Sequence, residues 1–329
     1  MMLSSFAFYA YQIIYTPNVL VEDDPRLFAV PHGMTFKQLQ DKLSKERVVN
    51  DMVSFSFLAK IKDLDTSLKP GMYTIASNMT NVALINLLRS GAQTPVKLTF
   101  SNARLLKQLP KALTQNLEID SANMANLLLA DTTAEHYGFN DETFISMFIP
   151  NTYEVYWTAT AKEILDRMKL EYNRFWNEER LAKAAALGMS KTEVATLASI
   201  VQGETNKMDE APTIAGVYIN RIKRGIPLQA DPTLVFAIGD FSIRRILNKD
   251  KEFDSPYNTY KYRGLPPGPI NMPSIPALDA VLNYDKHKYL YFCAKEDFSG
   301  YHVFARTLSE HNLNARKFQR ALNKERIYR

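Results

Sequence analysis

Apolar and polar positions between residues 190 and 204 alternate with the period of an α-helix, which gives this stretch one apolar face. Ser190 and Glu193 have the spacing of a capping box, and this predicts where the helix begins. Apolar residues then recur at i, i+3, i+4 and i+7, a spacing typical of a helix that packs one face against a core. The stripe consists of Val194, Leu197, Ala198 and Val201.

A carboxylate continues this apolar stripe. Glu204 stands three residues after Val201 and seven after Leu197, so the pattern places it on the core-facing side. Partial desolvation disfavours a charged carboxylate, and we therefore expect a raised pKa that suits a general acid near neutral pH. Gln202 lies about 200° around the helix from Glu204 and is not expected to be its close partner. The plainer alternative is a solvated residue at a frayed helix end, or an ion pair with Lys207.

A second helix is predicted over residues 211–224. Pro212 suits its first turn, Gly225 suits its end, and either Asp209 or Glu210 is its expected cap. Four apolar positions at helical spacing give it a core-facing stripe. They are Ile214, Val217, Tyr218 and Ile222.

A short helix and a long irregular segment are predicted next. Asp231 precedes Pro232, a pair that reads as a helix N-cap followed by proline at the first position, and this helix should end near Gly239. We expect Asp231 to act as that N-cap more than as a second acid. Residues 255–274 are rich in Pro, Gly, Tyr and Asn, which indicates a rigid loop that offers amide and aromatic contacts.

The first third of the chain switches between strand-like and helix-like patterns and predicts a small α+β module. A further strand and helix follow within residues 95–117, then a turn at 148–157, and one long helix or two between residue 161 and Gly188. The module itself consists of a strand at 27–30, a helix with Phe36, Leu39 and Leu43 on one face, a strand at 72–75 after a Pro70-Gly71 turn, and a helix from about Thr80 to Gly91.

The N-terminal segment is apolar and aromatic, with no charged residue before Glu22. A helix over residues 1–16 would extend about 24 Å, less than the roughly 30 Å hydrocarbon core of a bilayer. We interpret residues 1–20 as an N-terminal membrane anchor, whole or truncated, by the aromatic-belt argument. The alternative is an amphipathic or merely adhesive terminus.

Composition narrows the class of function. The 329 residues are 46% hydrophobic and 23% charged, which is typical of a folded chain of two or three domains. The net charge of +5 comes without a long Lys/Arg block, so no nucleic-acid partner is predicted. Cys293 is the single cysteine, and His302 and His311 lack a carboxylate at ligand spacing, so no metal site is predicted. No phosphate-binding glycine motif is present, and no cofactor is expected.

Several long motifs resemble a known family. They are "FIPNTYEVYW", "LASIVQGETN", "AGVYINRIKRGIPLQADPT", "YNTYKYRGLPPGPI" and "YLYFCAK" with "HVFARTLSEHN", and they run in order over residues 148–312. Together they are similar to the YceG-like family, the endolytic murein transglycosylases of bacterial cell-wall growth. The resemblance implies an α+β protein with a membrane anchor at 1–20, a LysM-like subdomain at 26–96 and a catalytic domain at 97–329. It also implies a single-pass inner-membrane protein whose catalytic domain is extracytoplasmic.

The resemblance further implies a chemistry and a set of site residues. The expected reaction cleaves the MurNAc-β-1,4-GlcNAc bond of peptidoglycan strands and leaves 1,6-anhydro-MurNAc ends, with Glu204 as the catalytic acid on a helix. Such cuts would terminate the elongation of nascent strands, and cell-wall synthases are the expected protein partners. The predicted substrate-binding residues are Gln229, Asn258 and Tyr260, with Asn220 either at the site or in a packing role.

Two alternatives stay open at this point. Many members of the family carry an acid two residues before the catalytic one, where this chain has Gln202, and this departure allows an inactive peptidoglycan-binding scaffold. A hydrolytic muramidase is the other alternative, with water as the nucleophile and Asp231 as the second acid.

Overall fold

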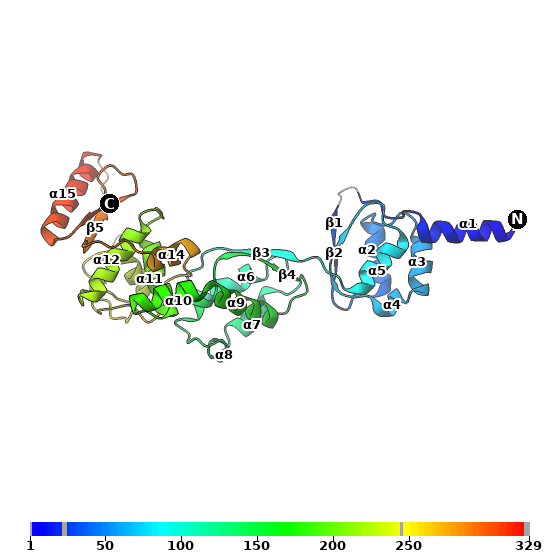
Figure 1. Cartoon of the computed structure of the whole chain (residues 1–329), viewed down its shortest axis with the longest axis horizontal. Helices are drawn as coiled ribbons and strands as arrows, with labels where there is room; N and C mark the ends of the chain where they lie inside the picture. Colours follow the sequence, from blue (N-terminus) through cyan, green and yellow to red (C-terminus); the bar gives the residue numbers. More distant parts are fainter. Residues whose placement is uncertain (1, 22–24, 244–245, 326–329) are drawn as a thin grey trace. The chain divides into compact units, whose positions relative to one another are not determined.

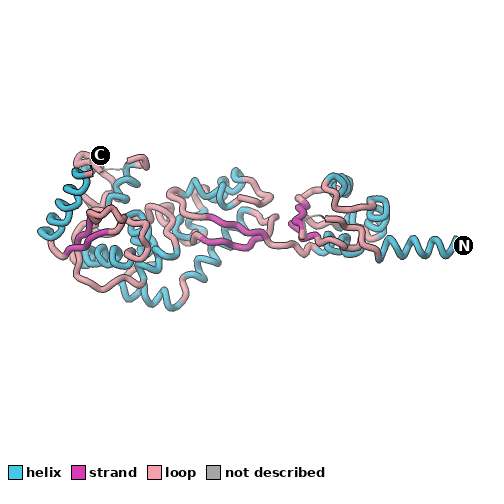
Figure 2. The backbone as a smooth tube through the Cα atoms, turned by 90° about the horizontal axis from the view of Figure 1, so that it is seen from above, coloured by secondary structure: helices cyan, strands magenta, loops and turns pink. Residues whose placement is uncertain are grey.

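The computed structural model describes residues 2–21, 25–243 and 246–325, and it has a mixed α+β architecture with short two-stranded sheets. Helices make up most of the described chain, and Figure 2 shows the paired strands in magenta. The chain divides into two compact units. Unit 1 comprises Met1–Leu98, Leu113–Met124 and Thr152–Ile164, and unit 2 comprises Thr99–Ala112, Ala125–Asn151 and Leu165–Arg329.

Unit 1 contains the small α+β module that the sequence predicts. Strand β1 (Arg26–Val30) pairs antiparallel with β2 (Gly71–Ile75), so that Val30 lies opposite Gly71. Apolar residues alternate into the core along both strands, as expected for a sheet with one covered face. Both predicted strands are confirmed.

Two predicted helices of unit 1 are also confirmed. Helix α2 (Phe36–Lys45) begins with a capping box at Thr35 and buries Leu39 and Leu43 completely. Helix α5 (Asn81–Ser90) is capped by the Thr80 hydroxyl and ends at Gly91 in the left-handed conformation.

Helices α3 (Met52–Ile61) and α4 (Leu64–Ser67) were absent from the predicted order of strand, helix, strand and helix. The side chain of Asp51 caps α3 by accepting hydrogen bonds from the first backbone N–H groups. On α3 the polar Ser54 is buried whereas the apolar Val53 is 74% exposed, which is the reverse of the usual pattern. Phe55, Leu58 and Ala59 are buried at helical spacing, but exposed apolar residues such as Phe57 and Ile61 obscure this pattern in the sequence.

The N-terminal segment forms α1 (Met2–Tyr15), in which Ile13 reaches the core of unit 1. Tyr11 and Tyr15 are exposed, and their ring centroids are 5.1 Å apart. Within the described part of the chain, no helix combines the length and apolar character that a bilayer crossing requires. The membrane anchor and the LysM-like nature of the module stay predictions.

A second sheet pairs β3 (Val96–Phe100) with β4 (Asn151–Val155). The turn predicted at residues 148–157 is wrong over half of its length, because β4 occupies residues 151–155. Tyr153 and Val155 are buried while Thr152 and Glu154 are exposed, which is the two-residue alternation of a strand. The proline and asparagine that precede these residues suggested a turn and hid this short strand.

The residues between 161 and Gly188 form two helices, α9 (Ala161–Phe175) and α10 (Glu178–Leu187). Asn177 separates them, since its side chain accepts a hydrogen bond from the Arg180 N–H and so caps α10. Gly188 ends α10 with a φ of 69°, as predicted.

The centre of unit 2 is built from helices that lie side by side in Figure 1: α11 (Lys191–Glu204), α12 (Ala211–Lys223) and α14 (Ile275–Leu282). A hairpin of β5 (Tyr291–Ala294) and β6 (His302–Ala305) packs against α15 (Leu308–Lys324). The remaining elements are α6 (Leu109–Leu113), α7 (Ser121–Leu128), α8 (Thr133–His136), α13 (Asp231–Ile238) and the 3₁₀ turns Leu106–Gln108, Phe144–Met147 and Asp250–Glu252.

Candidate active site

Helix α11 carries Glu204 as its last residue. The predicted capping box is present: Ser190 Oγ accepts from the Glu193 N–H at 3.2 Å, and the Glu193 carboxylate accepts from the Ser190 N–H at 2.8 Å. Residues 194–201 are all buried, so the predicted stripe is confirmed on a helix that is covered on every side. Beyond Val201 the C-terminal turn of α11 reaches accessible space again, and Glu204 stands there.

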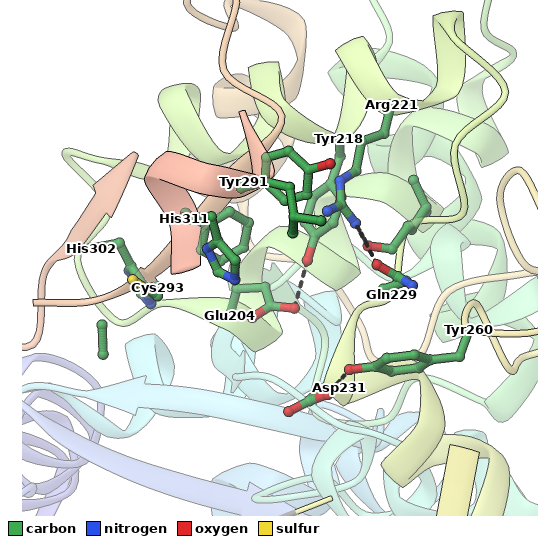
Figure 3. A pocket seen from close by; sticks show the side chains of 14 residues that line it. Glu204, Tyr218, Arg221, Gln229, Asp231, Tyr260, Tyr291, Cys293, His302 and His311 are labelled. Atoms are coloured by element: carbon green, nitrogen blue, oxygen red, sulfur yellow. Dashed lines mark hydrogen bonds between the residues drawn. The ribbon is translucent and has the colours of Figure 1, made fainter. Parts of the chain in front are cut away.

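Glu204 opens into a cavity of about 370 Å³, which we call the acid cavity. Its wall comes from α11, α12, the start of α13 with the segment before it, the irregular loop, the β5–β6 hairpin and α15 (Figure 3). Residues that are far apart in the sequence therefore line the same cavity. The lining residues are Glu204, Tyr218, Arg221, Leu228, Gln229, Asp231, Tyr260, Tyr291, Phe292, Cys293, Ala294, His302, Leu308 and His311.

The electrostatic environment of Glu204 favours its protonated form. The surrounding protein desolvates the carboxyl and raises its pKa to about 7, and the negative charge of Asp231 acts in the same direction. The hydrogen bond from Tyr218 and the positive charge of Arg221 oppose this shift. No described residue forms a salt bridge with Glu204, and the Lys207 ammonium lies instead over the Tyr301 ring at 5.1 Å. The raised pKa expected from the sequence agrees with this environment.

Tyr218 is the hydrogen-bond donor to Glu204. Its hydroxyl lies 2.6 Å from Glu204 Oε1, and its side chain is 1% exposed (Figure 3). Burial, followed by the nearby Glu204 carboxyl, raises the pKa of Tyr218 well above its ordinary value. The phenol therefore keeps its proton and holds one oxygen of Glu204 in a fixed position.

Arg221 joins three segments of the cavity wall. Its guanidinium donates to the Leu290 carbonyl through Nε at 2.7 Å and to the Leu228 carbonyl through Nη1 at 2.7 Å. The same Nη1 lies 3.5 Å from Gln229 Oε1, and the guanidinium lies 5.1 Å from the Tyr291 ring. Desolvation lowers the pKa of Arg221, but a guanidinium remains protonated near neutral pH.

The role of Asp231 differs from the predicted one, which was the N-cap of the short helix. Ala230 occupies the N-cap position of α13, and no side-chain cap hydrogen bond is present. The expected N-cap role is wrong because the Asp231 carboxylate turns to the cavity and accepts a hydrogen bond from the Tyr260 hydroxyl (Figure 3). Gly203 allows the close approach of α13, since a Cβ there would lie 2.8 Å from Pro232 Cβ. This contact keeps Asp231 close to Glu204.

Gln229 and Tyr260, two of the predicted substrate-binding residues, both line the acid cavity. Gln229 has a φ of 52°, a left-handed conformation that is uncommon outside glycine and that concentrates at functional sites. Its backbone N–H donates to the Thr259 carbonyl at 3.0 Å, which fixes the segment beside the irregular loop. Tyr260 is held through Asp231.

Asn258 and Asn220, the other two predicted residues, lie outside the cavity lining. Asn258 is fully buried, and its amide donates to the carbonyls of Lys251 and Phe253 while its oxygen accepts from the Tyr260 N–H. Asn220 donates to the carbonyls of His287 and Tyr289 on the segment before β5. The structure thus gives both asparagines positioning contacts, and a substrate-binding role for either stays a prediction.

Gln202 is directed away from Glu204, as the helical geometry predicts. Its amide donates to Asn271 Oδ1 at 3.0 Å and to the Met272 carbonyl at 3.3 Å, and its oxygen accepts from the Ser274 N–H at 2.8 Å. These contacts fasten α11 to the segment that leads into α14. Gln202 therefore has a structural role on a different side of the helix from the cavity.

Glu210 and His302 form a second polar pair beside the cavity. Glu210 is 7% exposed, and its Oε1 accepts from the Thr205 hydroxyl at 2.7 Å and lies 2.7 Å from His302 Nδ1. Its other oxygen accepts from the His302 N–H at 3.0 Å. Glu210, one of the two predicted caps, occupies the N-cap position of α12, but its side chain makes no cap bond. The pair instead ties the residue after Glu204 to the β5–β6 hairpin.

His311, on α15, also lines the acid cavity. Its ring stacks on Tyr291 with a centroid distance of 5.4 Å, and desolvation, followed by the charge of Arg221, lowers its pKa. Among the described residues, no group of three or more His, Cys, Asp or Glu side chains is arranged to hold a metal ion.

The sequence alone missed Tyr218, Glu210 and His302 as residues at or beside this cavity, and it considered Asp231 only as the second acid of a hydrolytic alternative. Tyr218 and Arg221 lie on α12, and His302 lies on β6, so only the packing of these elements brings them together. A polar residue within an apolar stripe was the one available signal, and it identified Glu204 alone.

The cavity thus holds a carboxyl group with a raised pKa that a phenol orients and other polar groups surround, an arrangement that suits general acid catalysis. The YceG-like family model matches residues 28–317, and the chain belongs to this family.

Known relatives carry a common name. An endolytic murein transglycosylase of Bacillus subtilis (strain 168) is 30% identical over 311 residues, which span 90% of this chain and 85% of that protein. The endolytic murein transglycosylase of Streptococcus pneumoniae strain D39 is 26% identical over 353 aligned positions, with 95% of this chain and 62% of that protein covered. A crystal structure of a YceG-like protein from Listeria monocytogenes matches with a TM-score of 0.56 and 27% identity, over 88% of this chain and 98% of that chain.

Proposed function

We propose that this chain is an endolytic lytic transglycosylase that cleaves MurNAc-β-1,4-GlcNAc bonds in peptidoglycan strands. The enzyme class follows from membership of the family and from the name that its relatives carry. The observation that carries the chemistry is Glu204, a carboxyl group whose pKa lies at about 7 in the wall of a cavity. Such a group can donate a proton near neutral pH and take one back.

The reaction uses this one acid twice. Glu204 gives its proton to the glycosidic oxygen as the bond from this oxygen to the muramyl C1 breaks. The C6 hydroxyl of the same sugar then bonds to C1, and its proton passes to the Glu204 carboxylate. The products are a GlcNAc hydroxyl and a 1,6-anhydro-MurNAc end, so no water is consumed and the acid is restored.

Four residues of the acid cavity support this reaction. Tyr218 holds one carboxyl oxygen, which leaves the other toward the cavity. The Asp231 carboxylate stands at the same wall, where its negative charge would stabilise the positive charge that develops at C1. Gln229 and Tyr260 supply amide and phenol groups to hold the glycan.

A hydrolytic muramidase is the second candidate, and the position of Asp231 favours it. Hydrolysis requires a second carboxylate as nucleophile or as base for water, and Asp231 lines the same cavity as Glu204. The two candidates differ in their products, since hydrolysis leaves reducing ends and transglycosylation leaves anhydro ends.

The cellular part of the proposal concerns location and timing. An anchor at residues 1–20 would hold the protein in the inner membrane with its catalytic domain outside, and the exposed aromatic residues of α1 support this. A LysM-like module at 26–96 would bind peptidoglycan. Cuts in nascent strands beside cell-wall synthases would terminate elongation and set strand length.

The test is mass spectrometry of uncrosslinked glycan strands after incubation with the full chain or with a Glu204→Gln variant. We expect internal fragments that end in 1,6-anhydro-MurNAc, and we expect none with the variant. Reducing ends would support the muramidase instead. Intact strands with the wild-type chain would contradict both activities and leave a peptidoglycan-binding scaffold.

A further inference from the structure

A second cavity of about 290 Å³ adjoins the acid cavity, and we call it the Arg104 cavity. Glu204 and Asp231 line both cavities, so the acid pair stands where the two spaces meet. Apart from these acids and Asn271, the lining is mostly apolar. It includes Pro232, Val235, Phe236, Phe241 and Ile270, with Arg104 as its cation.

Arg104 is held in place without a charge partner. Its guanidinium lies over the Phe241 ring, 4.8 Å from the centroid, and its backbone N–H donates to Gln108 Oε1 at 2.9 Å. The neighbouring Ala103 carbonyl accepts from the Met272 N–H at 2.7 Å, which ties this loop to the segment before α14. No carboxylate of the described residues forms a salt bridge with Arg104. The donor edge of the guanidinium is therefore available to a ligand.

The charged groups of the Arg104 cavity differ in which cavities they line. The two carboxyl groups, Glu204 and Asp231, line the acid cavity as well, whereas the Arg104 guanidinium lines the Arg104 cavity alone. An anionic group is repelled by Asp231 and attracted by Arg104, so it has one favourable position in this space. A guanidinium binds a carboxylate through two parallel hydrogen bonds, and the apolar wall suits the methyl groups that would accompany it.

We propose that Arg104 binds a carboxylate carried by the substituent on the muramyl ring, and that this contact selects peptidoglycan strands over uncharged glycans. The inference rests on the proposed function. Each muramyl sugar carries a lactyl ether close to the bond that Glu204 would cleave. This ether either ends in a free carboxylate or continues into a peptide stem that bears carboxylates of its own. Both sources present the same chemical group to Arg104.

The experiment compares three strand preparations with the full chain and its variants. The first preparation bears peptide stems, the second has had its stems removed so that free lactyl carboxylates remain, and the third is the second with these carboxylates converted to methylamides. The variants are Arg104→Ala, Arg104→Lys and, as a matched control, Arg224→Ala. Arg224 is an exposed arginine that lines neither cavity.

We expect Arg104→Ala to raise KM about tenfold on the strands that bear carboxylates and to change kcat little, since one charge-assisted contact is lost. On the methylamide strands the variant and the wild type should have equal KM values. Arg104→Lys should keep part of the preference, and Arg224→Ala all of it. The preparation with the larger effect identifies the source of the carboxylate.

Two results would overturn the inference alone. Equal KM values for Arg104→Ala and the wild type on every preparation would show that Arg104 contacts no carboxylate. An equal loss on charged and uncharged strands would show that Arg104 only supports Phe241, and thermal unfolding of the variant would reveal such a packing defect. If the wild-type chain cleaves none of the strands, the proposed function fails and this inference fails with it.

Discussion

Glu204 and Glu210 stand on either side of the turn that joins α11 to α12, and the structure uses these two carboxyl groups differently. Glu210 receives hydrogen bonds at both oxygens, from Thr205 and from His302. Glu204 receives one from Tyr218 and faces a cavity. The comparison teaches that burial alone does not make a carboxyl group a general acid. Such a group also needs few hydrogen-bond partners and access to a substrate.

The largest difference is expected in activity. Glu204→Gln keeps the shape of the side chain but cannot donate the proton, and we expect strand cleavage to fall by roughly a thousandfold or more. Glu210→Gln should retain cleavage within about tenfold while it lowers the free energy of unfolding by about 2 kcal/mol, because a buried bond is lost. Product formation and thermal unfolding of both variants provide the measurement. Similar activity losses in the two variants would remove the distinction.

The difference in stability between the wild type and Glu204→Gln should depend on pH. The folded-state pKa of Glu204 is raised from 4.5 to about 7, so the folded protein binds this proton more tightly than the unfolded chain does. Wild-type stability therefore falls as pH rises from about 4.5 to about 7. The glutamine variant lacks this loss and should be more stable by about 3 kcal/mol at pH 8, with little difference at pH 4. Denaturant unfolding at the two pH values would reveal a constant difference if this is wrong.

Asp231→Asn should affect both rate and pH dependence. Loss of its charge removes the stabilisation of the developing cation, and we expect kcat to fall by about a hundredfold. The same charge raises the pKa of Glu204, so without it the fall of activity at high pH should begin at a lower pH. A rate loss with an unchanged pH profile would indicate a purely structural role for Asp231.

Tyr218→Phe should have the smallest effect on kcat. It should shift the pH dependence of activity in the direction opposite to that of Asp231→Asn. Its hydrogen bond lowers the pKa of Glu204, so its removal should move the alkaline fall of activity to higher pH. We expect kcat to fall by about tenfold, because one orienting hydrogen bond is lost. The pH dependence of kcat provides the measurement, and a shift in the same direction as in Asp231→Asn would contradict the assigned contacts.

Local patterns predicted much of the fold. The capping boxes at Thr35 and Ser190, the glycine ends at Gly91 and Gly188, and the strands β1 and β2 depend on neighbouring residues and were predictable. Helix α3 and strand β4 were not. Ser54 is buried and Val53 exposed on α3, and β4 is stabilised by β3, which lies far away in the sequence.

The candidate site divides in the same way. Glu204 was found because an acid within an apolar stripe is a local signal. Tyr218 and Arg104 come together with it only through the packing of α11, α12 and the loop before α6. Asn258 shows that composition alone does not identify a binding residue. An asparagine in a loop rich in tyrosine suggests sugar binding, but the Asn258 amide donates to backbone carbonyls of its own loop.

The central claim is that Glu204 is the carboxylic acid that remains protonated near neutral pH, and NMR titration of side-chain carboxyl carbons in glutamate-labelled protein tests it most directly. We predict one glutamate resonance that titrates near pH 7 in the wild type and is missing in Glu204→Gln. If every glutamate titrates below about pH 5, or if the resonance near pH 7 persists in the variant, Glu204 is not the poised acid.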